Sequence, residues 1–323
     1  MALGGLWLMS NNMFLHTTTD HVRLACGNVM DWRDVIEPNS VKLSHVDGPY
    51  DMRKADWDCL TGARVEFNDQ LELIAKTYPD IPTDRINALG QYIAALTVLD
   101  PRGADLAAWY APVLTEVSAA SALSASVYLW NTDAGEALLR PVMQVFGWTY
   151  RGCLTWLKTG AHPALIGAAN AGTWADITER CGVYQRGNAA FCNPNRTSNV
   201  WALSPTSGMI HERLYGDEKA PHRVTGRMQQ VGAHPCQKPL DFAERIIRAS
   251  SNPNDLVVDW FAGTSRIAVA NVQRLDRSER RDVVSIEMDS RWFDAVAPAL
   301  CPKASLQVQD MAGQVGLFVT KHK

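Results

Sequence analysis

Short apolar runs, each bounded by turn residues, alternate along much of the chain with segments of helical periodicity. Such runs predict buried strands, because a few apolar residues between turn signals suit a sheet that is covered on both faces. The predicted strands are His21–Cys26, Val41–Val46, Ser126–Trp130, Tyr150–Leu157, Leu256–Val258 and Val283–Ile286. This alternation predicts an α/β fold with a doubly wound, mostly parallel sheet.

The segments between the runs repeat apolar residues at three and four positions, the spacing of one helix face. A helical stretch over 29–36 links the first two strands, as in a parallel crossover unit. Residues 58–125 are predicted to be mainly helical, with Thr83 placed to cap one helix. The remaining predicted helices are 135–146, a helix beginning at Pro239, 264–275 and 290–299.

The alternation stops between residues 158 and 233. This stretch is rich in Gly, Asn, Pro and Thr and has little helical period. A long loop-rich stretch inside a compact domain is usually functional. We therefore expect a loop-rich lobe inserted before the last two strands of the sheet.

Composition narrows the class of protein. The chain has 323 residues, of which 46% are hydrophobic, enough for one large α/β domain with a smaller lobe. It has no apolar run long enough to span a bilayer and no recognisable export signal. Its seven cysteines are isolated, without a Cys-x-x-Cys pair, so we predict no bound metal and a reducing, cytoplasmic location.

The net charge of −3 argues weakly against a nucleic-acid partner, because phosphate contacts favour a basic surface. Charge can nevertheless be local. Basic residues gather between residues 211 and 238. A nucleic-acid partner therefore stays open on charge alone.

Acidic and small residues follow two of the predicted strands. Asp259, Phe261, Ala262, Gly263 and Thr264 follow the run that begins at Leu256. Glu287 follows the next run, and Asn28 follows the first strand of the chain. Carboxyl ends of parallel strands form ligand pockets, where a glycine admits a close ligand and a carboxylate can hold a ribose diol. Alone, Asp259 could cap a helix and Glu287 could begin one; together they favour a ligand pocket.

The tetrapeptide Asp47-Gly48-Pro49-Tyr50 follows the strand 41–46. Taken alone it could be a simple turn. Its chemistry also suits an exocyclic amine, whose two N–H groups could be held by the carboxylate of Asp47 and the carbonyl of Gly48. The ring of Tyr50 could stack on a base that has left the double helix.

These motifs, with the segment His234-Pro-Cys-Gln237-Lys238-Pro239, resemble the beta (permuted) group of amino DNA methyltransferases. The resemblance covers most of residues 20–300 and implies a circularly permuted, Rossmann-like methyltransferase fold. It also implies S-adenosyl-L-methionine as cofactor and double-stranded DNA as partner. The implied catalytic residues are Asp47, Gly48, Pro49 and Tyr50. The implied cofactor-binding residues are Asn28, Gln237, Lys238, Asp259, Phe261, Ala262, Gly263, Thr264 and Glu287.

The resemblance assigns roles within that set. The loop at Gly263 would cradle the methionine part of the cofactor, and Asp259 would lie near its amino group. Glu287 would hold the ribose, and the segment at Gln237 and Lys238 would close over the methionine end.

The chain departs from the family pattern at several positions. Gly48 stands where proline is usual, which predicts a looser loop and a gain in rate or affinity for Gly48→Pro. Trp260 replaces another proline, and Ser265 stands where a second glycine is common. Asn28 stands where a Gly-Asp pair usually contacts adenine. These departures predict weaker cofactor affinity.

The resemblance also divides the chain. It implies a leader (1–19), a catalytic part (20–202) with a helical insertion at about 58–125, a target-recognition region (203–233), a cofactor-binding part (234–300) and a tail (301–323). The predicted DNA-binding residues lie within the recognition region and are Arg213, Lys219, Arg223 and Arg227. Each of them could instead contact only phosphates or water.

The favoured function is methyl transfer to adenine N6 in a flipped base, because the tetrapeptide begins with Asp. Cytosine N4 is the alternative base. A catalytically weak relative that binds DNA or cofactor is a second class, and an RNA or small-molecule methyltransferase is a third. The resemblance further suggests a restriction-modification role and allows a homodimer.

Overall fold

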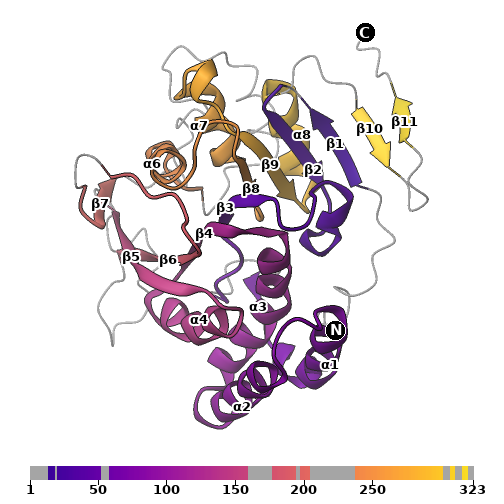
Figure 1. Cartoon of the computed structure of the whole chain (residues 1–323), viewed down its shortest axis with the longest axis vertical. Helices are drawn as coiled ribbons and strands as arrows, with labels where there is room; N and C mark the ends of the chain where they lie inside the picture. The colour runs from indigo at the N-terminus through magenta and orange to yellow at the C-terminus, as the bar shows by residue number, and fades with distance from the viewer. Residues whose placement is uncertain are drawn as a thin grey trace.

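An 11-stranded sheet in the order β11-β10-β1-β2-β9-β8-β3-β4-β6-β5-β7 organises the molecule (Figure 1). This computed structural model describes residues 14–18, 20–51, 58–158, 177–193, 197–203, 237–300, 306–309 and 315–318. The strands are β1 (Phe14–Thr18), β2 (Val22–Cys26), β3 (Val41–Val46), β4 (Ser121–Asn131), β5 (Thr149–Lys158), β6 (Thr178–Arg186), β7 (Val200–Leu203), β8 (Leu256–Asp259), β9 (Asp282–Glu287), β10 (Leu306–Gln309) and β11 (Val315–Phe318).

Helices connect and cover these strands. The α-helices are α1 (Phe67–Thr77), α2 (Thr83–Leu99), α3 (Pro101–Ala120), α4 (Asp133–Val145), α6 (Leu240–Ser250), α7 (Arg266–Gln273) and α8 (Ser290–Leu300). The described residues also form the short 3-10 helices η2 (Val29–Asp34), η4 (Ala63–Glu66) and η6 (Arg277–Glu279). In the part of the chain that the structure describes, no helix is long and apolar enough to cross a membrane.

The five strands β2, β9, β8, β3 and β4 lie side by side and run parallel. Their carboxyl ends therefore meet at one edge of the sheet. The register aligns His45 with Asp259 and Cys26 with Glu287. The doubly wound, mostly parallel sheet predicted from the sequence is confirmed, and each predicted strand has a counterpart in the structure.

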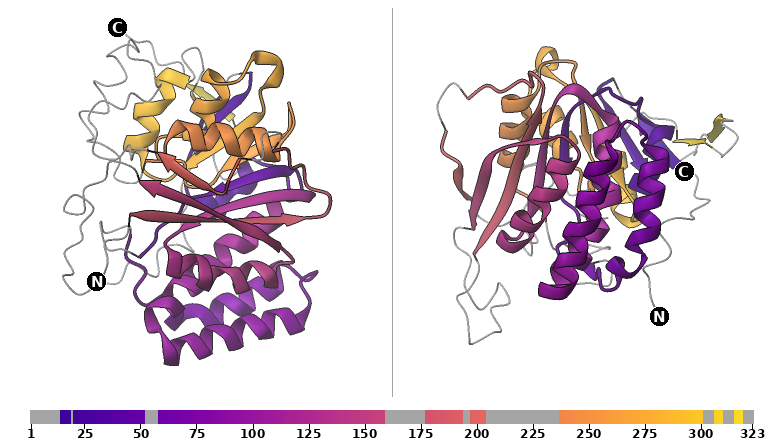
Figure 2. Two further views of the ribbon diagram at one scale, coloured as in Figure 1. Left: turned by 90° about the vertical axis from the view of Figure 1, so that its left-hand side faces the viewer. Right: turned by 60° about the horizontal axis from the view of Figure 1, so that its bottom comes forward.

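Two hydrophobic cores fill the space above and below the sheet. One packs α2, α3, α4 and η2 against one face, and the other packs α6, α7 and α8 against the opposite face. Figure 2 shows these two groups of helices on either side of the strands. The alternation within β4 explains the division, since Leu129 points into the first core and Trp130 into the second.

The helical stretch between β3 and β4 forms a layer of its own, built from α1, α2 and α3. Helix α3 is apolar on nearly all sides and is buried over most of its length. A helix that is hydrophobic all round belongs in a core. It contacts α2 and α4, and α4 itself packs on β4, β5 and β6.

Several predicted boundaries were wrong. Strand β4 begins at Ser121, five residues before the predicted start, and Thr83 makes no capping hydrogen bond. The stretch 158–233 is not loop alone, since β6 and β7 both lie in it. Neither strand shows an alternation of polar and apolar residues, and pairing of β6 with β4 and of β7 with β5 decides their conformation.

The predicted leader and tail also contain strands. Strand β1 pairs with β2 on one side and with β10 on the other, and β10 pairs with β11. All three pairings are antiparallel. The ends of the chain thus extend the parallel sheet at its β2 edge.

One buried carboxylate ties η2 to α3. The indole Nε1 of Trp32 donates to Glu116 Oε2 at 2.6 Å, and Arg33 donates to the same oxygen at 2.7 Å. Trp32 is fully buried and meets Trp260 edge to face, with ring centroids 6.2 Å apart. The interaction joins the crossover after β2 to the central helix of the first core.

We expect Trp32→Phe to lower the free energy of unfolding by about 2–3 kcal/mol, through a lost buried hydrogen bond and a small cavity. Urea denaturation followed by circular dichroism measures this. Leu123→Ala, at a side chain that is 84% exposed, is the control and should change stability by less than about 0.5 kcal/mol. If Trp32→Phe were as stable as Leu123→Ala, the stabilising role of the hydrogen bond between Trp32 and Glu116 would be contradicted.

Candidate active site

The edge formed by the carboxyl ends of the parallel strands collects most of the predicted site residues. Asp47 and Tyr50 follow β3, Asp259 ends β8 and Glu287 ends β9. Asn28 follows β2 at the same edge. Residues 47 and 259, more than 200 positions apart in sequence, thus lie at the carboxyl ends of neighbouring strands.

A buried cluster of charges surrounds Asp47. Lys238 lies just before α6, and its Nζ lies 2.8 Å from both carboxylate oxygens of Asp47. The same ammonium lies 3.0 Å from Glu179 Oε2 on β6 and 3.0 Å from the hydroxyl of Tyr50. Glu179 also pairs with Lys158 on β5 at 2.7 Å. The two lysines and two carboxylates balance in charge, and each side chain is at most 14% exposed.

The lysines set the ionisation of Glu179. Burial alone would raise the pKa of this carboxyl, but the charges of Lys238 and Lys158 outweigh it and lower the pKa to about 2. Glu179 is therefore ionised at every physiological pH. It holds Lys238 beside Asp47, and its Oε2 also lies 3.4 Å from the hydroxyl of Tyr50.

The tetrapeptide is fixed by several hydrogen bonds. The hydroxyl of Tyr50 donates to Asp47 Oδ1 at 2.6 Å, and the Tyr50 amide donates to Asp58 at 2.8 Å. Gly48 and Pro49 are buried. The hydroxyl of Tyr110, on α3, donates to the carbonyl of Pro49 at 3.1 Å. Asp47, by contrast, is partly exposed at the strand end, where a ligand can approach it.

Asp259 is buried and paired with a histidine that the sequence analysis did not single out. Its Oδ1 lies 2.8 Å from Nδ1 of His45, and the two side chains are 2% and 8% exposed. Asp259 does not cap helix α7, whose N-cap is Ser265. The next residue, Trp260, is fully buried, and its amide donates to the carbonyl of His45. A proline at position 260 could not make this last bond.

Glu287 receives two backbone hydrogen bonds. Gly263 N–H donates to Oε2 at 2.6 Å, and Asp289 N–H donates to Oε1 at 2.7 Å. Burial raises the pKa of Glu287 to about 7, and the negative charges of Asp289 and Asp259 act in the same direction against those two bonds. Each carboxylate oxygen keeps a further acceptor position for a ligand hydroxyl.

The loop after β8 turns sharply through two left-handed residues. Gly263 has φ +50° and Ser265 has φ +51°. The left-handed region suits glycine and costs other residues about 1 kcal/mol. Ser265 therefore occupies a position where the backbone itself favours the glycine that is usual in the family. Ala262, Thr264 and Ser265 are buried around this turn.

The other predicted residues fall into three groups. Asn28 is buried and uses its side-chain oxygen to cap η2, with Met30 N–H as the donor. Gln237 is buried beside Lys238, whose ammonium reaches the tetrapeptide. Arg213, Lys219, Arg223 and Arg227 lie outside the described residues, as does nearly all of the segment 203–233.

Sequence reasoning missed His45, Lys158 and Glu179. His45 gave only a weak signal, because Lys42 and Ser44 are also polar in the run 41–46. Glu179 gave no signal, because its strand was predicted as loop. Within the described residues, no group of three or more His, Cys, Asp or Glu side chains could hold a metal ion.

The depressed pKa of Glu179 predicts an acid-dependent loss of stability. An acid whose pKa is lower in the folded state stabilises the fold above its ordinary pKa and loses that contribution as pH falls. Between pH 6 and pH 3 this contribution should decline by about 2 kcal/mol. Glu179→Gln should be less stable than wild type at pH 6 but should lose less on acidification. Urea denaturation at both pH values measures the free energy of unfolding.

Glu72→Gln, on α1, is the control, and its free energy of unfolding should fall between pH 6 and pH 3 by as much as that of the wild type. If the free energy of unfolding of Glu179→Gln fell with pH as much as that of the wild type, the lowered pKa of Glu179 would be refuted.

Comparison with known proteins agrees with this geometry. A family model described as DNA methylase, of the N6 and N4 type, matches residues 41–297. The type II methyltransferase M1.MboII of Moraxella bovis is 26% identical over 271 residues, which cover 75% of this chain and 84% of that protein. The DNA adenine methyltransferase YhdJ of Escherichia coli (strain K12) is 35% identical over 93 residues, 28% of this chain and 29% of that protein.

The fold is likewise shared with a solved structure. The PvuII DNA methyltransferase (cytosine-N4-specific) superposes with a TM-score of 0.56 at 14% identity, covering 87% of this chain and 86% of that chain. The matched residues include the tetrapeptide after β3 and the acids that end β8 and β9. The methyl donor of this family is S-adenosyl-L-methionine. The chain belongs to the N6 and N4 family of DNA methylases.

Proposed function

We propose that this protein transfers a methyl group from S-adenosylmethionine to adenine N6 in double-stranded DNA, with Asp47 as the residue that holds the amine. One observation carries the proposal. The Asp47 carboxylate lies at the sheet edge that also carries Asp259 and Glu287, on strands next to one another. A methyl donor held by the two acids and an amine held by Asp47 would therefore lie close together.

The donor set at this edge fits the cofactor. Glu287 keeps acceptor positions for a ribose diol, and the turn at Gly263 lets a ligand approach the backbone closely. Asp259 supplies a negative charge for the cofactor's amino group, and His45 holds that carboxylate in place. When bound, the cofactor supplies an electrophilic methyl group.

The chain's own residues would orient the amine. Asp47 Oδ and the Gly48 carbonyl would accept its two N–H groups and turn the nitrogen lone pair toward the methyl group. As positive charge develops on nitrogen, the nearby carboxylate would stabilise it. Lys238 and Glu179 fix the Asp47 carboxylate, so little reorganisation is needed at the reacting nitrogen.

Tyr50 would exchange one contact for another when a base enters. Its hydroxyl donates to Asp47 Oδ1 in this structure, which occupies one acceptor position of the carboxylate. Turning the ring to stack on the flipped base would free that position. Lys238 would remain to balance the charge of Asp47.

Adenine is favoured over cytosine because the tetrapeptide begins with Asp. The partly matching YhdJ is named as an adenine enzyme, whereas the structural relative PvuII is named as specific for cytosine N4. Cytosine N4 is the alternative, since both bases present an exocyclic amine with two N–H groups. Contacts of Arg213, Lys219, Arg223 and Arg227 with DNA, a homodimer and a cytoplasmic location remain predictions from the sequence. A restriction-modification role is supported by the name of M1.MboII as a type II methyltransferase.

Methylation of DNA tests the proposal directly. Unmethylated DNA is incubated with the protein and S-adenosylmethionine, digested, and examined by nucleoside mass spectrometry. We expect N6-methyladenine from the wild type and a loss of at least about 100-fold in Asp47→Ala. Asp80→Ala, at an exposed loop position, is the matched control and should keep full activity. N4-methylcytosine would support the alternative base, and a fully active Asp47→Ala would overturn the assignment of this residue.

The raised pKa of Glu287 predicts that cofactor affinity depends on pH. The acid must be ionised to accept two hydroxyl hydrogen bonds, and its pKa of about 7 leaves it mostly protonated at pH 6. The dissociation constant for S-adenosylmethionine should therefore be about tenfold higher at pH 6 than at pH 8. Isothermal titration calorimetry at both pH values measures it.

Two variants separate this effect from general acid sensitivity. Glu287→Gln should bind S-adenosylmethionine weakly at both pH values, with equal dissociation constants at pH 6 and pH 8. Glu279→Gln, in η6 before the opposite end of β9, should keep the tenfold difference between the two pH values. A pH dependence that survives in Glu287→Gln would show that another group titrates.

A further inference from the structure

The glycine of the tetrapeptide has no room for a side chain. A Cβ at Gly48 would lie 2.7 Å from the hydroxyl oxygen of Tyr110, 3.3 Å from its Cζ and 3.2 Å from Cε2 of Phe261. A contact of 2.7 Å is too short for a real Cβ, so something must shift. The sequence-based expectation that Gly48→Pro raises the rate is therefore opposed by the packing.

Tyr110 cannot easily move aside. It lies in the middle of α3, its side chain is fully buried, and its ring meets Trp109 edge to face with centroids 4.9 Å apart. Its hydroxyl donates to the carbonyl of Pro49 at 3.1 Å. Burial, together with the nearby charge of Asp47, holds the pKa of Tyr110 well above its ordinary value, so the hydroxyl remains a donor.

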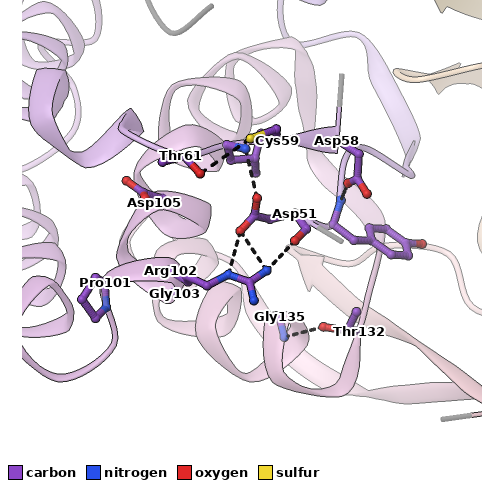
Figure 3. Close-up of polar contacts among 12 residues, drawn as sticks. Asp51, Asp58, Cys59, Thr61, Pro101, Arg102, Gly103, Asp105, Thr132 and Gly135 are labelled. Carbon is purple, nitrogen blue, oxygen red and sulfur yellow. Dashed lines mark hydrogen bonds and ion pairs between the residues drawn. The ribbon is translucent and has the colours of Figure 1, made fainter. Parts of the chain in front are cut away.

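The same helix also holds the residue after the tetrapeptide. Arg102, eight residues before Tyr110, donates to the backbone carbonyl of Asp51 at 2.6 Å and to its carboxylate at 3.2 Å (Figure 3). Asp51 has φ +55°, and its other carboxylate oxygen accepts the Leu60 amide at 3.1 Å. Helix α3 thus contacts the chain at both residue 49 and residue 51.

These contacts replace what a proline would supply. A proline at position 48 would limit the backbone by its ring, whereas Gly48 leaves the backbone free in the unfolded chain. In the folded protein, the Tyr110 hydroxyl fills the space beside Gly48 and fixes the peptide that follows. The loop is therefore ordered by a tertiary contact in place of a local one.

We propose that Tyr110 is a positioning residue for methyl transfer, which holds the Asp47–Tyr50 loop through Pro49 in the volume that Gly48 leaves open. This inference rests on the proposed role of the loop in binding the amine. Tyr110 acts through the backbone of the loop and does not touch the reacting atoms. Gly48 and Tyr110 are then a matched pair, and their substitutions should not act independently.

A double-mutant cycle tests the pairing. Tyr110→Phe should lower kcat for DNA methylation about tenfold, because loss of the hydrogen bond to Pro49 lets the loop backbone move, including the Gly48 carbonyl that would accept one N–H of the amine. Gly48→Ala should lower it about 100-fold, because its Cβ displaces the loop. Gly48→Ala combined with Tyr110→Phe should recover to roughly the level of Tyr110→Phe alone, because the nearest obstructing atom is gone. The dissociation constant for S-adenosylmethionine should stay within about twofold of wild type in Tyr110→Phe, because the lost hydrogen bond holds the tetrapeptide backbone at Pro49.

Tyr92→Phe is the matched control. Tyr92 lies in the same helical layer and donates from its hydroxyl to the carbonyl of Leu138 at 2.9 Å, which ties α2 to α4. The variant Tyr92→Phe should lose this hydrogen bond and keep the kcat of the wild type. Equal kcat in Tyr110→Phe and Tyr92→Phe, or independent losses in the double variant, would overturn the inference.

Hydrogen exchange gives a readout that does not depend on turnover. Mass spectrometry should show faster amide exchange over residues 47–51 in Tyr110→Phe and unchanged exchange there in Tyr92→Phe. Unchanged exchange in Tyr110→Phe refutes the inference whatever the activity. An inactive Asp47→Ala beside a fully active Tyr110→Phe would reject the inference and keep the proposed function. An active Asp47→Ala would reject the proposed function.

Discussion

The ammonium group of Lys238 joins the start of α6 to two parts of the chain that are far away in sequence, the tetrapeptide after β3 and strand β6. It contacts Asp47 and the hydroxyl of Tyr50 in the tetrapeptide and Glu179 on β6, all within 3.0 Å. Removing a charge from such a buried group leaves its partners uncompensated, which costs several kcal/mol. The position of the tetrapeptide relative to α6 and β6 therefore depends on this one cation. The methyl-transfer site proposed above would be assembled from both halves of the chain through this contact.

The helical layer between β3 and β4 supports the same site from below the sheet. Tyr110 contacts the tetrapeptide, and its neighbour Trp109 lies against Phe261 of the loop after β8, with ring centroids 6.0 Å apart. One turn of α3 thus touches both the loop proposed to hold the amine and the loop proposed to hold the methyl donor. Rigid packing of this kind favours a fixed geometry between two reactants. The departures from the family pattern at Gly48 and Trp260 each have a structural account, in the contact with Tyr110 and in the amide bond to His45. The structure gives no reason for serine at position 265, where φ is +51°.

The two acids at the strand ends differ in environment, although sequence alone made them look alike. Asp259 is almost wholly buried and bound to His45. Glu287 is half-buried and accepts two backbone amides, with a pKa raised to about 7. The first is held in a fixed orientation by its contact with His45, and the second is suited to a proton-linked contact with hydroxyl groups.

The sequence by itself determined the class of fold, the parallel strands and the residues at their ends. Apolar periodicity reports burial directly, and motifs such as Asp47–Tyr50 and Asp259–Gly263 are contiguous, so both can be read from local order. Tertiary structure alone decided that β6 is a strand, that Lys238 and Glu179 flank Asp47, and that Tyr110 lies beside Gly48. Those facts depend on strand pairing and on contacts between residues up to 191 positions apart, as between Asp47 and Lys238. No local pattern encodes such contacts, because their free energy arises only when the whole sheet brings the partners together.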